Sequence, residues 1–283
     1  ANIGVRVRNG NAFSFGRFRA VGNSSNGVDI ADSTNVVLSR VVSANNGSFG
    51  IHAASTLLAV DSCVVWSNQR GAVFQSGGAL GISNSVLHAY GENRYAIARP
   101  AGGTMSANYN NIRALDGAYV GLVLGVPARN LIRWQQITSN DLFSLSHEPL
   151  FVNPASGDYH LQSTEGRYNP ATGGFVVDAA SSLMIDAGDQ LASFAAEPTP
   201  NGNRRNMGLY GGDAHASKTP SGGWLLVLTL NDGGTVNGTN DIRWLAGGVA
   251  TGHLVHVDFS RDGGTTWTNI ATNVSASAGV VTW

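Results

Sequence analysis

Apolar and polar positions recur with a period of about 22 residues through the first hundred residues of the chain. Each period opens on a glycine followed by an alternating segment, and these glycines are Gly4, Gly27, Gly50 and Gly71. Three apolar columns follow at matching offsets: Phe13, Val36, Leu58 and Leu80; Phe15, Leu38, Val60 and Ile82; Val42, Val64 and Val86. Self-similarity at this period predicts a solenoid in which each repeat stacks on the one before, with the columns as interior ladders.

The segments within each repeat have the pattern of β-strands. Apolar residues alternate with polar ones, as in Val5-Arg6-Val7, which is typical of a strand with one buried face. Turn-forming clusters such as residues 45–48 separate the strands, and the signature of leucine-rich repeats is missing. The expected fold is therefore all-β, a right-handed parallel β-helix of about five coils. The fifth coil is expected over residues 95–112, with Met105 and Ala107 continuing the ladders.

Composition narrows the class of protein. Charged residues make up 12% of the 283 positions, about half their share in an average soluble domain. The formal net charge of −1 argues against a nucleic-acid partner, and no apolar run approaches the roughly 18 residues of a membrane span. Cys63 is the only cysteine, so it forms no internal disulfide and is expected to pack in the core.

Charge is unevenly distributed along the chain. Residues 1–115 carry nine arginines and four acids, whereas residues 116–218 carry ten acids and six basic residues. A basic β-helix is expected to attract an anionic polysaccharide or the acidic part of a neighbouring copy. The alternative is that the charges are distributed by chance and have no functional role.

The repeat begins without an initiator Met, a signal peptide or a cap, and the chain ends in a strand-like run at 280–283. We therefore expect a piece of a longer, processed, modular protein.

Residues 116–218 lack the repeat and carry a series of short motifs. In order these are Glu148-Pro-Leu-Phe-Val-Asn-Pro154, Gly157-Asp-Tyr-His-Leu161, Ile185-Asp-Ala-Gly-Asp189 and Asn206-Met-Gly-Leu-Tyr-Gly-Gly212. The series resembles the closing region of bacterial secreted proteins with a pectate-lyase-like right-handed β-helix. Arg205 and Leu209 depart from that pattern. The resemblance implies a secreted β-helix protein, in a group that includes polysaccharide lyases, epimerases and surface proteins.

Residues 219–283 have the pattern of a separate β-module. Strands are expected at 224–230, 241–244, 254–259 and 266–270, with Gly-rich turns between them. The module resembles the Ig-like or fibronectin-like repeats of bacterial surface proteins. Residues 260–267 fit the Asp-box of sialidases, a hairpin turn whose role is structural. About five strands are expected where a sandwich has seven, so we expect an incomplete sandwich with an open edge that recruits strands of other chains.

One outward row of the β-helix carries candidate chemistry. Arg6, Asp29, His52 and Val73 occupy equivalent positions in four coils. Elimination from a uronate sugar needs a base, a cation against the carboxylate and an acid for the leaving oxygen. His52 is the candidate base and Arg6 the candidate cation, while Asp29 has no second carboxylate near it. The alternative is that these residues only face the solvent and make a local Arg–Asp contact, and we favour this alternative.

The sequence predicts no cofactor and no metal site. A calcium site needs several converging carboxylates, and the coils hold only four acids. Five further histidines lie at a turn, in the closing region or on a strand of the third module, and none has a pattern of metal ligands: His88, His147, His160, His253 and His256.

Two functions remain. The first is an extracellular structural or adhesive protein of the cell surface, self-assembling head to tail into a homopolymer through the uncapped coil and the open sandwich edge. The second is a polysaccharide lyase or epimerase acting on an acidic polysaccharide. Five coils are few for a substrate groove and the outward rows are poor in acids and bases, so we favour the first.

Overall fold

The computed structural model describes residues 2–54, 56–229, 237–247 and 253–283. Contacts between residues divide the chain into two compact units, Ala1–Thr219 and Pro220–Trp283. The repeats and the motif series of residues 116–218 belong to the first unit. Among the described helices none is long and apolar enough to cross a membrane.

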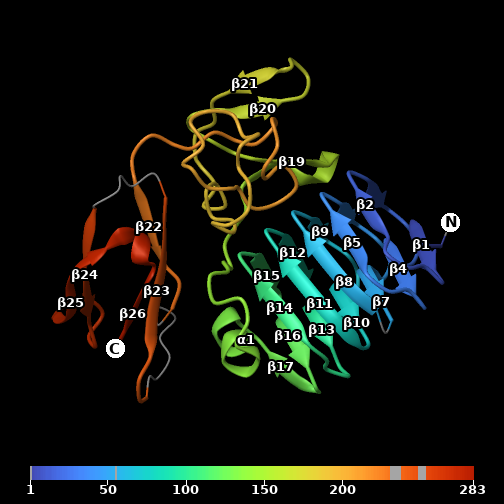
Figure 1. The fold of residues 1–283 in the computed structure, drawn as a ribbon, viewed down its shortest axis with the longest axis horizontal. Coiled ribbons are helices and arrows are strands. Elements are labelled where there is room, and N and C mark those ends of the chain that lie inside the picture. Colours follow the sequence, from blue (N-terminus) through green and yellow to red (C-terminus); the bar gives the residue numbers. More distant parts are fainter. Residues whose placement is uncertain (1, 55, 230–236, 248–252) are drawn as a thin grey trace. The chain divides into compact units, whose positions relative to one another are not determined.

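Three parallel sheets form a solenoid of about five turns in the first unit, as the repeat predicted (Figure 1). Sheet I contains β1 (Val5–Arg8), β4 (Val28–Ala31), β7 (Phe49–Ala53), β10 (Gly71–Gln75), β13 (Tyr95–Arg99) and β16 (Tyr119–Val123), with β17 (Val126–Ala128) added antiparallel. Sheet II contains β2 (Ser14–Gly16), β5 (Val36–Ser39), β8 (Thr56–Asp61), β11 (Gly78–Ser83) and β14 (Met105–Asn108). Sheet III contains β3 (Arg19–Val21), β6 (Val42–Ala44), β9 (Val64–Trp66), β12 (Val86–Tyr90) and β15 (Asn111–Leu115).

Two of the three expected ladders form the core, except that Phe13, the expected first member of one of them, is 42% exposed. Val36, Leu58, Leu80 and Met105 are register partners in sheet II, and so are Leu38, Val60, Ile82 and Ala107. The expectation for the third ladder was wrong, because its valines lie outside the core cluster while their strand neighbours Val65 and Leu87 belong to it. All three valines are nevertheless buried, and Val86 lies against the closing region, where a Cβ on Gly208 would be 3.4 Å from Val86 Cγ2.

A two-residue corner joins sheet II to sheet III in every turn. Its first residue has a positive φ between 52° and 58° at each level: Arg17, Arg40, Ser62, Asn84 and Tyr109. This conformation costs about 1–2 kcal/mol for a residue with a side chain. Hydrogen bonds along the stack offset the cost, since the corner amide of one turn donates to a carbonyl of the next, as from Arg40 N to Asp61 O at 3.0 Å. The corner therefore depends on stacking rather than on glycine.

Asparagines line the turn between sheet III and sheet I, and of these Asn46 and Asn68 are buried. Asn23 Nδ2 donates to Asn46 Oδ1 at 2.8 Å, and Asn46 Nδ2 donates to Asn68 Oδ1 at the same distance. The Nδ2 groups of Asn46 and Asn68 also donate to backbone carbonyls, so each buried amide of the ladder has hydrogen-bond partners in the protein. We call these three residues the asparagine ladder.

A helix covers the C-terminal end of the solenoid core. Helix α1 (Leu131–Thr138) begins at Asn130, whose side chain accepts a hydrogen bond from Arg133 N. Trp134 of this helix is buried against Gly121 of β16, where a Cβ would lie 2.3 Å from the indole ring. The indole Nε1–H donates to the buried Asp141 carboxylate at 2.9 Å. The helix thus covers the last rungs of the core (Figure 1).

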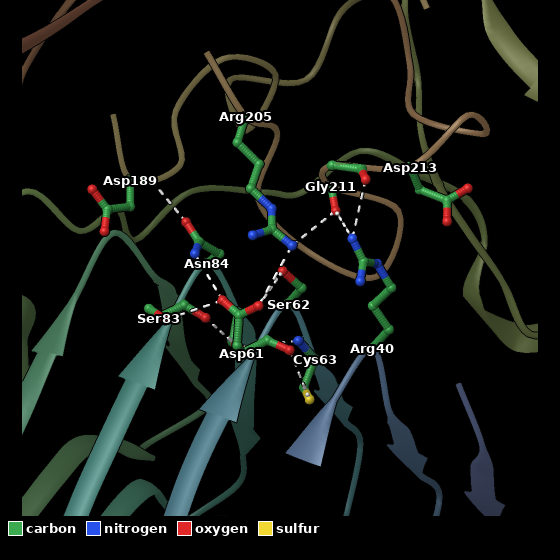
Figure 2. A network of polar contacts seen from close by, with 12 residues as sticks. Arg40, Asp61, Ser62, Cys63, Ser83, Asn84, Asp189, Arg205, Gly211 and Asp213 are labelled. Carbon is green, nitrogen blue, oxygen red and sulfur yellow. Dashed lines mark hydrogen bonds and ion pairs between the residues drawn. The ribbon is translucent and has the colours of Figure 1, made fainter. Parts of the chain in front are cut away.

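The closing region contains two hairpins and long loops. The hairpins are β18 (Phe151–Asn153) with β19 (Asp158–Leu161), joined by the 3-10 turn η1 (Pro154–Ser156), and β20 (Arg167–Asn169) with β21 (Gly174–Val176). Figure 2 shows how its loops meet the corners of the solenoid. Arg205 Nη2 lies 3.4 Å from Asp61 Oδ2, and Arg40 donates to Gly211 O at 3.0 Å. Cys63 is buried beside this network, as expected, and burial raises the pKa of its thiol to about 12.

The described residues of the second unit form two antiparallel sheets. One contains β22 (Trp224–Val227), β23 (Asp241–Gly247) and β26 (Val280–Thr282), and the other contains β24 (Leu254–Phe259) and β25 (Thr268–Ser275), which the 3-10 turn η2 (Ala276–Ala278) follows. Strands are present in all four expected segments, although Leu230 lies outside the described residues. Asp262 accepts hydrogen bonds from Thr266 N at 2.8 Å and from Thr266 Oγ1 at 2.7 Å, the turn geometry that the Asp-box predicted.

Candidate functional site

The candidate row lies on the outward side of sheet I, with one correction. Arg6 is opposite Asp29, and Asp29 is opposite His52, as expected. The next position is Phe74, whereas Val73 pairs with Ile51 and is fully buried. The expected fourth position was wrong because it was aligned on Gly71, which pairs with Phe49 and not with Gly50. A slip of one residue exchanges the inward and outward faces of a strand.

Asp29 is the centre of this row. Its carboxylate is 4% exposed and accepts hydrogen bonds from Arg8 Nη2 at 2.6 Å and Asn26 Nδ2 at 3.2 Å. Arg6 Nε lies 3.7 Å from the same carboxylate, and His52 Nδ1 lies 2.8 Å from Oδ1. Arg8 and Asn26 were not identified from the sequence. Arg8 could have been identified from the sequence, because it is two residues from Arg6 and residues two apart on a strand share a face.

The histidine of the row has a defined orientation. A carboxylate only accepts hydrogen bonds, so Nδ1 of His52 carries the proton in this contact and Nε2 is the acceptor of the neutral ring. The ring stacks on Phe74 at 5.1 Å with an interplanar angle of 6°, and Phe74 lies 4.9 Å from Phe49. Asp29 and Phe74 therefore hold the imidazole from two sides, with 30% of its side chain exposed.

Aromatic residues continue along later turns of sheet I. Tyr95 and Tyr119 stack at 5.2 Å, and Tyr95 is the register partner of Gly71. The Arg129 guanidinium lies over the Tyr119 ring, 4.5 Å from its centroid. The outward side of sheet I thus passes from cationic residues in the first turns to aromatic residues in the later ones. We call the cluster of Arg6, Arg8, Asp29, His52 and Phe74 the cationic face.

The cationic face holds two of the three groups that elimination from a uronate requires. His52 Nε2 is a base, and Arg6, whose side chain is 57% exposed, is a cation for a carboxylate. The only acid in the register row is Asp29, and its carboxylate already binds Arg8 and His52. In the described ranges no three His, Cys, Asp or Glu residues gather in a metal-binding arrangement.

The other candidate histidines are not members of the cationic face. His160 is buried, lies 2.6 Å from Asp158 Oδ1 through its Nδ1 and stacks on Tyr210 at 3.7 Å. His88 is buried against Trp66, and burial lowers its pKa to about 4. Burial, with the Arg113 charge as a smaller cause, also lowers the pKa of His147. His253 precedes β24 and His256 lies within it.

Two buried carboxyls of the closing region were not identified from the sequence. Burial raises the pKa of Glu197 to about 7 and that of Asp186 to about 6. Glu197 Oε1 accepts hydrogen bonds from Asn206 N at 2.9 Å and Gly212 N at 2.6 Å, and Asp186 Oδ1 accepts one from Thr219 Oγ1 at 3.0 Å. Through these hydrogen bonds both carboxyls join loops of the closing region, and burial brings both pKa values closer to neutral pH.

Comparison of the chain with protein-family models, with curated proteins and with solved structures finds no match.

Proposed function

We propose that this chain is an extracellular structural or adhesive module of a bacterial cell surface that binds an acidic polysaccharide along sheet I. The supporting observation is the cationic face. Two guanidinium groups and an imidazole surround a single carboxylate, so the face keeps an excess of positive charge. Arg6 and Arg8 keep 57% and 38% of their side chains exposed, which leaves N–H donors for a uronate carboxylate.

The solenoid suits a polymeric ligand. Register partners in neighbouring turns are about 4.8 Å apart, so an elongated chain laid along the stack meets equivalent positions repeatedly. A polyanion would contact Arg6 and Arg8 first and then the rings of Phe74 and Phe49. The extracellular location rests on the motif series of the closing region. The Ig-like nature of the second unit rests on its antiparallel strands and on the Asp-box turn.

Binding to alginate and pectin tests this proposal. Wild type is expected to bind both polyanions and to bind neutral dextran at least tenfold more weakly, with affinity falling as salt screens the guanidinium groups. The double variant Arg6→Ala, Arg8→Ala is expected to lose most of this binding. Arg133→Ala, which removes an exposed arginine of helix α1, is the matched control. Equal binding of alginate and dextran, or an unchanged double variant, would overturn the proposal.

One observation favours a lyase as a second candidate. His52 Nδ1 contacts Asp29 at 2.8 Å, which orients the ring and leaves Nε2 as a base beside Arg6. In the elimination Nε2 removes the C5 proton, the C4–C5 double bond forms, and the C4–O bond breaks as the leaving oxygen takes a proton from water. Unsaturated products absorb in the near ultraviolet. Their formation by wild type and their loss in His52→Ala would support the lyase, and absence of product from a broad panel of polyanions would exclude it.

A further inference from the structure

The asparagine ladder ends beside a cavity. Val64 pairs with Val86 and Gly71 pairs with Tyr95, so the connection from sheet III to sheet I is two residues longer in the fourth turn than in the third. A cavity of about 660 Å³ lies there, within the range of small-molecule sites. It is lined by Asn68 and Gln69 of one turn and by His88, Tyr90, Glu92 and Arg94 of the next. We call it the ladder-end cavity.

Asn68 brings an unused hydrogen-bond donor to this cavity. It is 3% exposed, accepts hydrogen bonds from Asn46 and donates from Nδ2 to Ser43 O at 2.9 Å. In Asn46 the Nδ2 group also donates to the next rung of the ladder. No further rung follows Asn68 in the described part of the solenoid. Its second N–H is therefore available to an acceptor in the cavity that it lines.

Aromatic rings form another wall of the cavity. His88 is 5% exposed and stacks on Trp66 at 4.1 Å, which holds the imidazole plane in place. Burial keeps this ring neutral at physiological pH, because it lowers the pKa to about 4, and its Nδ1 has no hydrogen-bond partner. Tyr90 is 56% exposed, and its hydroxyl bonds to Asp116 on the neighbouring turn. The electron-rich face of such a ring attracts the C–H groups of a sugar.

The charged residues of the cavity balance one another. Glu92 and Arg94 contribute one charge of each sign, so a ligand with a net charge gains attraction from one and repulsion from the other. Paired hydroxyl groups suit this lining, because they donate to a carboxylate and accept from a guanidinium and an amide. We propose that the ladder-end cavity binds a neutral pyranose sugar. It shares no residue with the cationic face, so this site does not depend on the proposed polyanion binding.

NMR on the full chain, observing both the ligand signals and the tryptophan indole signals, tests the site. The probes are the methyl glycosides of glucose, galactose, mannose and N-acetylglucosamine, with methyl glucuronide as the charged comparison. At least one neutral glycoside is expected to bind with a millimolar Kd and to shift the Trp66 indole signal, which Trp66→Phe assigns. Tyr90→Ala is expected to weaken that binding at least tenfold, while Tyr90→Phe keeps the ring and retains it.

The controls separate this site from the cationic face. Arg6→Ala is expected to leave glycoside binding unchanged, and Tyr90→Ala is expected to leave alginate binding unchanged. Tyr90 is half exposed, so its truncation leaves the core intact, and circular dichroism checks the fold of each variant. Failure of every neutral glycoside to bind at about 20 mM, stronger binding of the glucuronide, or full binding by Tyr90→Ala would each overturn the proposal.

Discussion

The buried carboxyl of Glu197 makes the stability of the closing region depend on pH. Burial raises its pKa from 4.5 to about 7, so the folded state holds its proton more tightly than the unfolded state. The stabilisation is complete below about pH 4.5 and is lost as the pH rises through about 7. A shift of about 2.5 pKa units corresponds to about 3 kcal/mol at most, at about 1.4 kcal/mol per unit.

Glu197→Gln removes this titration and keeps the fold contacts. A glutamine Oε1 still accepts from Asn206 N and Gly212 N. The variant and wild type are therefore expected to have similar unfolding free energies at pH 4. At pH 8 the variant is expected to be more stable by up to about 3 kcal/mol. Asp186 titrates in the same direction and remains in both proteins.

Urea unfolding at several pH values, followed by tryptophan fluorescence, measures the difference. The expected result is a gap between variant and wild type that opens between about pH 4.5 and pH 7 and is constant above it. A gap that is the same at pH 4 and pH 8, or that favours wild type at pH 8, would show that the Glu197 carboxyl does not control stability in this pH range. Asp178→Asn, at a more accessible carboxyl paired with Arg167, is the control for a general charge effect.

Two further predictions concern stacking and assembly. Asn46→Ala is expected to lower the unfolding free energy by about 3 kcal/mol, because it leaves Asn23 N and Ala20 O without their hydrogen-bond partner. The control is Thr34→Ala, which removes an exposed side chain. A loss of stability in Asn46→Ala no larger than in Thr34→Ala would contradict the prediction. The opposite charges of residues 1–115 and 116–218 predict head-to-tail association that weakens at high salt, measured by sedimentation velocity. A strictly monomeric protein at high concentration and low salt would exclude this association.

The repeat predicted the solenoid because stacking leaves a direct trace in the sequence. Equivalent positions such as Leu58 and Leu80 meet in the same environment, so the same residue type recurs at the period of the turn. The corner between sheets II and III left no such trace. Arg40 and Ser62 adopt the same positive φ with different side chains, because hydrogen bonds between turns stabilise that conformation.

The candidate row was predictable only as far as the period stayed regular. Arg6, Asp29 and His52 are spaced by 23 residues and lie together. Between β7 and β10 the register advances by 22 residues, so Phe74 takes the place expected for Val73. A slip of one residue exchanges the inward-facing and outward-facing side chains of a strand. Only the observed hydrogen-bond register shows which residue faces outward.

Patterns along the chain were enough to predict the parallel solenoid, two of its core ladders, the Asp-box turn and the clustering of Arg6, Asp29 and His52. These features depend on periodicity or on neighbours along the chain. The burial of Glu197, the closure by α1 and the cavity beside Asn68 became visible only in the folded chain. Each of these depends on which distant segments meet, and therefore on packing and desolvation that no local pattern records.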